Sequence, residues 1–188
     1  MSVMSTTYDA IPYGRPLTID DLGATPDDGN RYELIDGVLV VSAAPRRIHG
    51  FVAEALADVL RRHCPRGWRV MTTEFATVLS PDTLAIPDLV VLPALTATEM
   101  RDESHVDEPQ LVVEVLSPST ALNDLNVKFA RFERAGIPSY WVVDPDSLRL
   151  IAWELTDGRY VEVADVTDGS WTATRPFEVT IAPSELLD

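Results

Sequence analysis

The sequence predicts an α/β (α+β) fold with a mixed central sheet, helices packed against it and added antiparallel strands. Two amphipathic segments are separated by strand-like runs, and four more such runs follow the second segment. An order of helix, three strands, helix and strand favours a layered domain. The 188 residues, 46% of them hydrophobic, suffice for one substantial core. We therefore expect one domain over residues 16–188, preceded by a flexible arm over residues 1–15.

The first elements are short and are bounded by turn residues. Residues 16–22 are typical of a short helix with Thr18 as its N-cap and acids in its first turn. The run RYELIDGVLVVS reads as two strands joined at Asp36-Gly37, a dipeptide typical of a hairpin turn. We therefore expect a short helix followed by a β-hairpin.

The spacing of apolar residues predicts two longer helices. Residues 49–63 place apolar side chains at helical spacing with charged ones opposite, and residues 120–135 do the same before Gly136 ends the helix. Strand-like runs lie at residues 68–80, 86–92, 110–116, 139–145, 148–155, 159–166 and 171–181. An acidic loop over residues 96–109 precedes the third run, and the tail PSELL is typical of one helical turn.

Composition limits where the protein acts and what it binds. Lys+Arg number 15 against Asp+Glu 30, a net charge of -15 that opposes broad adhesion to nucleic acid or anionic lipid. Any phosphate-bearing substrate therefore needs a locally neutralised site. Without a bilayer-length apolar window or a signal-like start, we expect a cytoplasmic protein with no membrane partner. The single cysteine, Cys64, excludes an intrachain disulfide and a cysteine-rich zinc site.

Glu114 is the one acid inside LVVEVLSPST, an apolar run that stops at Ser-Pro-Ser. In strand register it shares a face with Val112 and Leu116, while the neighbouring valines point the other way. Since both faces are apolar, we expect a central strand with Glu114 near its C-terminal end. A buried carboxylate costs on the order of several kcal/mol unless a cation or hydrogen bonds compensate it.

Asp88 poses the same problem near the start of the run IPDLVVL. If its strand and the Glu114 strand are antiparallel neighbours, the two carboxylates meet at one edge of the sheet. Carboxylates held together repel each other, raise one pKa or bind a divalent metal, and their oxygen atoms suit Mg²⁺ or Mn²⁺.

Lys128 is the only lysine, since every other basic residue is arginine. A coding bias towards arginine explains this ratio, and so does a lysine retained for specific chemistry. Asp124 lies one helical turn earlier, so Lys128 is equally well explained as half of an exposed ion pair.

The ordered motifs resemble the PD-(D/E)XK nuclease superfamily. Its signature is Pro-Asp on one strand and Asp/Glu-X-Lys on the next, which here match Pro87-Asp88 and Glu114-Val115. More specifically, the chain from about Pro16 to its C-terminus resembles the restriction endonuclease family often called Uma-two. The motifs that carry this resemblance are YELIDG, the Pro-Asp pair, LVVEVLSPST, Asp124 with Lys128, and GIPSYWVVDP.

The resemblance implies a restriction endonuclease-like core and hydrolysis of DNA phosphodiester bonds with Mg²⁺ or Mn²⁺. Asp88 and Glu114 would hold the metal. Leu116 occupies the position where the signature has lysine, and the resembling family commonly supplies that lysine from the following helix, which implies Lys128. Glu33 and His49 match two further family positions. The resemblance implies that Glu33 completes the site through metal or water, and that His49 assists proton transfer or contacts phosphate.

Structural explanations stand beside these roles. Asp88 is also typical of a strand start, Glu114 of a buried acid paired with arginine, His49 of a helix start, and Glu33 of a hairpin edge. Two other functions stay open: a non-catalytic interaction or regulatory protein that keeps the fold, and a metal-dependent hydrolase of small phosphoesters. The superfamily also implies a homodimer, since cutting a duplex often needs two sites.

Overall fold

The computed structural model describes residues 11–12, 14–72, 75–96, 98–99, 108–118 and 120–188. Most of the expected N-terminal arm and of the acidic loop lies outside the described residues. The elements in chain order are η2 (Ile19–Ala24), β1 (Arg31–Ile35), β2 (Val38–Ser42), α1 (Arg47–His63), β3 (Trp68–Thr72), β4 (Thr77–Ser80), β5 (Thr83–Ala85), β6 (Leu89–Pro93), β7 (Leu111–Val115), η4 (Asn123–Lys128), α2 (Phe129–Ala135), β8 (Ser139–Asp144), β9 (Arg149–Thr156), β10 (Arg159–Val166), β11 (Trp171–Ala173), β12 (Val179–Ile181) and η5 (Pro183–Glu185).

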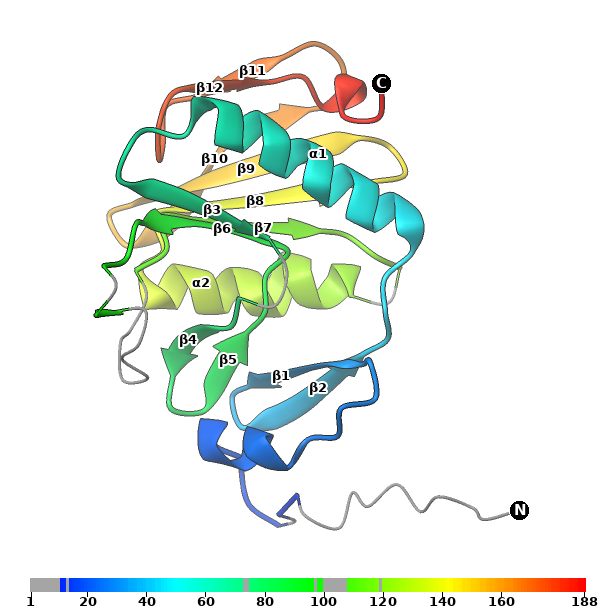
Figure 1. Cartoon of the computed structure of the whole chain (residues 1–188), viewed down its shortest axis with the longest axis vertical. Coiled ribbons are helices and arrows are strands. Elements are labelled where there is room, and N and C mark those ends of the chain that lie inside the picture. Colours follow the sequence, from blue (N-terminus) through cyan, green and yellow to red (C-terminus); the bar gives the residue numbers. More distant parts are fainter. Residues whose placement is uncertain (1–10, 13, 73–74, 97, 100–107, 119) are drawn as a thin grey trace.

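A six-stranded sheet forms the centre of the molecule, in the order β10-β9-β8-β7-β6-β3 (Figure 1). Only β7 and β8 are parallel, with η4 and α2 as the crossover between them, and the other pairs are antiparallel. The predicted mixed sheet is thus confirmed. The runs expected at residues 148–155 and 159–166 extend this sheet, and β11 and β12 form a separate hairpin.

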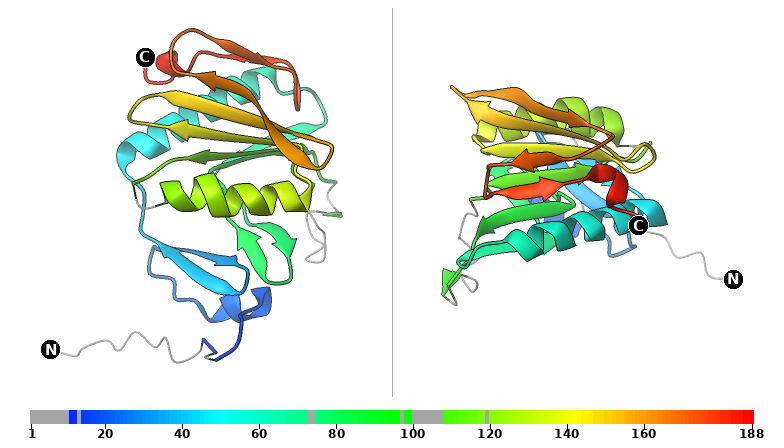
Figure 2. Two further views of the ribbon diagram at one scale, coloured as in Figure 1. Left: turned by 180° about the vertical axis from the view of Figure 1, so that it is seen from behind. Right: turned by 90° about the horizontal axis from the view of Figure 1, so that it is seen from above.

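Helices cover both faces of the sheet, as the view from above shows (Figure 2). Alternate residues of β7 divide between two cores: Val113 and Val115 pack with α1, and Val112 packs with α2. The apolar stripe of α1 includes Leu56 and Leu60, both fully buried. The amphipathic period of the sequence therefore predicts this packing correctly.

A smaller sheet, in the order β2-β1-β5-β4, lies below the main one in Figure 1. Its β1–β2 hairpin turns at Asp36 and Gly37, whose φ angles are 51° and 75°. Positive φ at both central residues is the requirement of a tight hairpin turn. A Cβ at Gly37 would also lie 2.6 Å from the Pro16 Cβ. Both the positive φ angle and this close approach therefore require glycine.

The sequence predicts one continuous strand-like run over residues 68–80, and the structure has two strands there. The stretch at residues 68–80 divides into β3, which joins the main sheet, and β4, which joins the smaller one. The chain then turns at Pro81-Asp82 into β5, a three-residue strand that the sequence pattern did not indicate. The chain therefore leaves the main sheet after β3 and returns to it in β6, directly after Asp88.

The second helix begins differently from the prediction. Residues 123–128 form a π-helical turn before regular α-helix runs to Ala135. Gly136 ends the helix at φ 79°, as expected for a left-handed C-terminal glycine. A π-turn is rare in proteins and is frequent at functional sites.

Candidate active site

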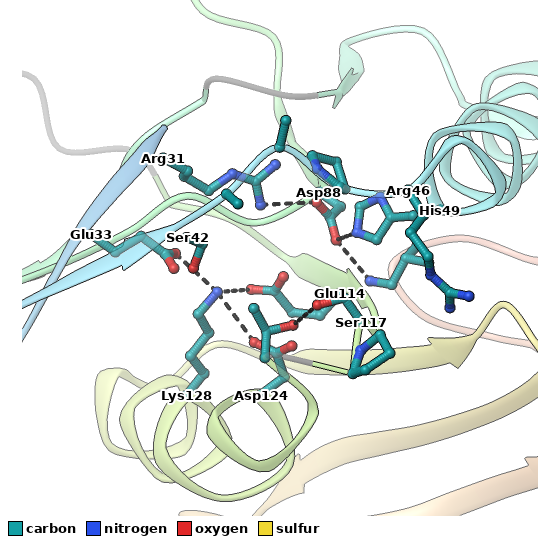
Figure 3. Close-up of a pocket in the computed structure, with 16 residues that line it drawn as sticks. Arg31, Glu33, Ser42, Arg46, His49, Asp88, Glu114, Ser117, Asp124 and Lys128 are labelled. Carbon is teal, nitrogen blue, oxygen red and sulfur yellow. Dashed lines mark hydrogen bonds and ion pairs between the residues drawn. The ribbon is translucent and has the colours of Figure 1, made fainter. Parts of the chain in front are cut away.

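A pocket of about 190 Å³ lies where both sheets meet the two helices (Figure 3). Strand β1, the first turn of α1, the approach to β6, the end of β7 and the π-turn each contribute a side chain. All five expected site residues line it: Glu33, His49, Asp88, Glu114 and Lys128. Residues that are up to 95 positions apart in the chain therefore meet in one place.

Asp88 and Glu114 come together because β6 and β7 are antiparallel neighbours. Leu89 pairs with Val113 in the register. Continuing that register by one residue sets Asp88 opposite Glu114, and residues opposite each other project to the same face. The two side chains are 1% and 2% exposed, so both carboxylates are removed from bulk water.

Lys128 reaches the Glu114 carboxylate from the π-turn. Its Nζ lies 2.9 Å from Glu114 Oε1 and 2.9 Å from Glu33 Oε1. Asp124 Oδ1 lies 3.4 Å from the same nitrogen. The alternative of an exposed Asp124–Lys128 pair is wrong, since these residues are 1% and 2% exposed. One ammonium therefore bridges three buried carboxylates.

Asp88 is held on both carboxylate oxygens. Arg31 Nη1 donates to Oδ1 at 3.1 Å, while the Val115 amide donates to Oδ2 at 2.8 Å and His49 Nε2 lies 3.0 Å from Oδ2. Burial alone raises the pKa of Asp88, but the hydrogen bond from His49 and the charges of His49 and Arg31 outweigh it and hold the pKa below its usual range. Asp88 is thus a preorganised anion.

Glu114 has the opposite electrostatics. Complete burial raises the pKa of Glu114 well above its usual value, and although Lys128 opposes this, Asp124 and Asp88 add to it. Burial likewise raises the pKa of Asp124. For Lys128, burial lowers the pKa, but Glu114 and the other nearby carboxylates more than offset it, so the net direction is upward and the ammonium stays charged.

The hydrogen bonds of Glu33 connect the hairpin to the start of β6. Its Oε1 accepts from the Ile86 amide at 2.7 Å as well as contacting Lys128. Arg31, two residues earlier on the same face of β1, donates to the Ile86 carbonyl at 3.3 Å. The hairpin thus fixes the chain just before Asp88.

Two supporting residues were not predicted. Arg31 is signalled in the sequence by its spacing of two from Glu33, which sets both side chains on one face of a strand. The other is Tyr140 of β8, whose hydroxyl donates to the Asp124 carbonyl at 3.0 Å, and that carbonyl also accepts the Phe129 amide in the π-turn. No local sequence signal indicates this contact, because it depends on the parallel β7–β8 pairing.

The charge balance of the pocket fits a divalent cation. Lys128 and Arg31 are the cations in contact with its buried carboxylates, which are Glu33, Asp88, Glu114 and Asp124. With all four acids ionised, one net negative charge remains when His49 is protonated and two remain when it is neutral. Across the described part of the chain, no three His, Cys, Asp or Glu side chains form a ready metal-binding group. Two carboxylates with substrate phosphate and water are the usual ligands of Mg²⁺.

The mixed sheet, with its paired carboxylates and lysine, places the chain in the class of PD-(D/E)XK nuclease folds. A model of the Uma2 family, described as "putative restriction endonuclease", matches residues 19–183. The chain therefore belongs to this family, as its motifs predicted.

A solved structure supports the fold. A "putative nuclease belonging to DUF820" from Anabaena variabilis superimposes with a TM-score of 0.71 at 17% identity, covering 92% of this chain and 98% of the other. No curated protein matches the chain in sequence. Among the described residues, no helix has both the length and the apolar character needed to cross a bilayer.

Proposed function

We propose that the protein hydrolyses phosphodiester bonds of DNA with the help of Mg²⁺ or Mn²⁺. The observation that carries the proposal is the 2.9 Å contact between Lys128 Nζ and Glu114 Oε1. It supplies, from the helix after β7, the ammonium that the nuclease signature has two residues after the glutamate. Family membership supports the same activity.

Asp88 and Glu114 would hold the metal, which when bound lowers the pKa of water and offsets charge on the reacting phosphate. Side chains of the protein itself position the two carboxylates. Arg31 and His49 hold Asp88 as an anion, and Lys128 holds the Glu114 carboxylate beside Asp88. The ammonium of Lys128 also faces the pocket, where it can stabilise negative charge on a phosphate oxygen.

The remaining two expected residues have supporting roles in this proposal. Glu33 holds Lys128 from the side opposite Asp124, so the ammonium is centred between two strands and the helix. His49 contacts Asp88 directly and orients its carboxylate. Glu33 therefore acts on the metal-binding pair through Lys128, whereas His49 acts on Asp88 by direct contact.

Cleavage assays with matched variants test the proposal. Plasmid and single-stranded DNA are incubated with wild-type protein and with Asp88→Asn, Glu114→Gln and Lys128→Met, in Mg²⁺, in Mn²⁺ and in EDTA. Each variant should lose at least about 10²-fold in rate. Asp165→Asn is the control, because this carboxylate pairs with Arg149 on the surface at 2.6 Å, and its rate should equal wild type.

Metal-dependent cleavage that survives both Asp88→Asn and Glu114→Gln would show that the metal lies elsewhere. Isothermal titration with Mn²⁺ gives an independent measurement. If no metal binds and no DNA is cut, the non-catalytic interaction protein becomes the better reading, and the net charge of -15 then favours a basic partner.

We further propose that two copies act together when both strands of a duplex are cut, in the cytoplasm. One pocket serves one phosphodiester bond, so a double-strand break needs two pockets. Sedimentation velocity at several protein concentrations should reveal a dimer. A strictly monomeric chain that converts supercoiled plasmid directly to linear form would contradict this.

A further inference from the structure

A second hollow adjoins the catalytic pocket and shares a wall with it. Its volume is about 440 Å³, against about 190 Å³ for the catalytic pocket. Ala43, Ala44 and Pro45, which connect β2 to α1, line both spaces, and so does Arg31. Sites for small organic molecules typically measure about 300–1,000 Å³. The second hollow falls in this range, whereas the catalytic pocket is smaller.

Arg31 stands at the junction of the two spaces. Its Nη1 donates to Asp88 Oδ1 and to the Ile86 carbonyl. Among the described residues, its other guanidinium nitrogens have no hydrogen-bond partner, and the side chain is 24% exposed. In Figure 3 the guanidinium reaches Asp88 with one nitrogen and directs another away from it. Since guanidinium donors form a fork, Arg31 can hold Asp88 and a neighbouring phosphate at once.

The lining of the second hollow suits a nucleobase better than another phosphate. Arg31 is its cation and Asp27 its acid, and the other described lining residues are uncharged. These are Thr25, Gly29, Asn30, Tyr32, Ala43, Ala44, Pro45 and Ile86. A base is flat and neutral and has hydrogen-bonding edges, so a lining that mixes apolar residues with uncharged polar ones matches its chemistry.

We propose that the second hollow holds the unpaired base of the nucleotide next to the scissile phosphate, and that the preferred substrate is single-stranded or locally unpaired DNA. The inference rests on the proposed function, because it takes that phosphate to lie in the catalytic pocket. A paired base must leave its stack to enter a concave site. The net charge of -15 acts in the same direction, since a duplex has about twice the charge density of a single strand.

Two variants with equal charge change test the second hollow. Asn30→Glu adds a negative charge to its lining, and Ser170→Glu adds the same charge at an exposed turn after β10. Fluorescence anisotropy measures the binding of a labelled 12-nucleotide strand of thymidine nucleotides, in low salt with Ca²⁺. The same strand, paired with a complementary strand of deoxyadenosine nucleotides, is measured as the duplex. Hydrolysis of bis(p-nitrophenyl) phosphate in Mn²⁺ is measured separately, because this ester can react in the catalytic pocket without a base in the hollow.

We expect the single strand to bind about tenfold more tightly than the duplex. Asn30→Glu should weaken single-strand binding about threefold or more, whereas Ser170→Glu leaves it within experimental error. Hydrolysis of the small ester should be the same in all three proteins. Equal binding of strand and duplex, or equal effects of the two variants, would overturn the inference.

The proposed function and this inference fail in different ways. If wild-type protein hydrolyses neither DNA nor the small ester, while Asn30→Glu still weakens single-strand binding, the hollow binds a base but the nuclease proposal is wrong. If hydrolysis is normal and the single strand has no advantage, the nuclease proposal stands and the base site is wrong.

Discussion

The two faces of the six-stranded sheet are built by different means. On the α1 face, Val52, Leu56 and Leu60 pack on alternate residues of β7, and the described core cluster is apolar. On the α2 face, the same strand presents Glu114 to Lys128, and an aromatic cluster that includes Tyr140 and Trp153 lies beside this buried charge. One strand therefore supports an apolar core and an ionic site, separated only by the alternation of its side chains.

The comparison shows where stability and function diverge. Apolar packing on the α1 face gains stability wherever surface is buried. The charges on the α2 face each require desolvation, and the balance depends on their partners. We therefore expect substitutions on the α1 face to change stability and those on the α2 face to change activity, with stability effects of either sign.

Replacing Lys128 should have the largest effect. Lys128→Met leaves three buried carboxylates without their shared ammonium, so we expect the unfolding free energy to fall by about 3–5 kcal/mol and cleavage by about 10²–10³-fold. Urea denaturation and DNA cleavage measure the two effects. Arg131→Met on α2 removes a surface pair with Asp36 and should cost less than about 1 kcal/mol. Equal losses in both variants would contradict the buried network.

Truncation on the α1 face should separate stability from activity. Leu56→Ala removes a fully buried side chain, so we expect a loss of about 2–5 kcal/mol. The rate per folded molecule, measured well below the midpoint of thermal unfolding, should stay within about threefold of wild type. A loss of rate as large as that of Lys128→Met would show that the two faces are coupled.

The two metal-site candidates should differ in the sign of their effect on stability. The folded-state pKa of Asp88 is lowered, so its ionised form stabilises the fold above its unfolded pKa, and this contribution is lost as pH falls through the folded pKa. Asp88→Asn should therefore destabilise at neutral pH by on the order of 1 kcal/mol or more.

For Glu114 the folded-state pKa is raised, so ionisation destabilises the fold as pH rises above the unfolded pKa, and the cost is complete above the folded pKa. Glu114→Gln should then stabilise at alkaline pH, and the gain should shrink as pH falls towards about 4.5. Thermal unfolding in EDTA from pH 4 to 9 measures both variants. Parallel pH profiles would show that the two carboxylates have the same environment.

The smallest effect concerns the aromatic support of the π-turn. Tyr140→Phe removes the hydroxyl that binds the Asp124 carbonyl, and Tyr160→Phe removes an equivalent bond to the Ile137 carbonyl at 3.0 Å. Each should lower stability by about 0.5–1.5 kcal/mol. We expect only Tyr140→Phe to lower kcat, by a few-fold with KM unchanged, because only this bond fixes the turn bearing Lys128. Equal kcat values would remove Tyr140 from the site.

Much of this architecture follows from local patterns. The hydrophobic period predicts α1, the Asp36-Gly37 pair predicts the hairpin, and alternation in residues 111–115 separates Glu114 from the α1 face. The meeting of Asp88 with Glu114 was also a consequence of antiparallel order. These features depend on short-range geometry, which a sequence displays directly.

What escaped prediction depends on pairing between distant segments. The division of residues 68–80 between two sheets is decided by partners that only the folded chain supplies. The burial of Asp124 beside Lys128 depends on the π-turn, and regular i,i+4 spacing gives no sign of it. Arg31 was missed because a surface ion pair and a buried anchor look alike in sequence.

The π-helical turn from Asn123 to Lys128 also changes how the charged groups are spaced along the chain. Such a turn closes its hydrogen bonds over five residues, where an α-helix uses four. Lys128 Nζ reaches Glu114 Oε1 at 2.9 Å from a position 14 residues further along, whereas the nuclease signature has its lysine two residues after the glutamate. In this chain the distance between the two charged groups is short although their separation in the sequence is long.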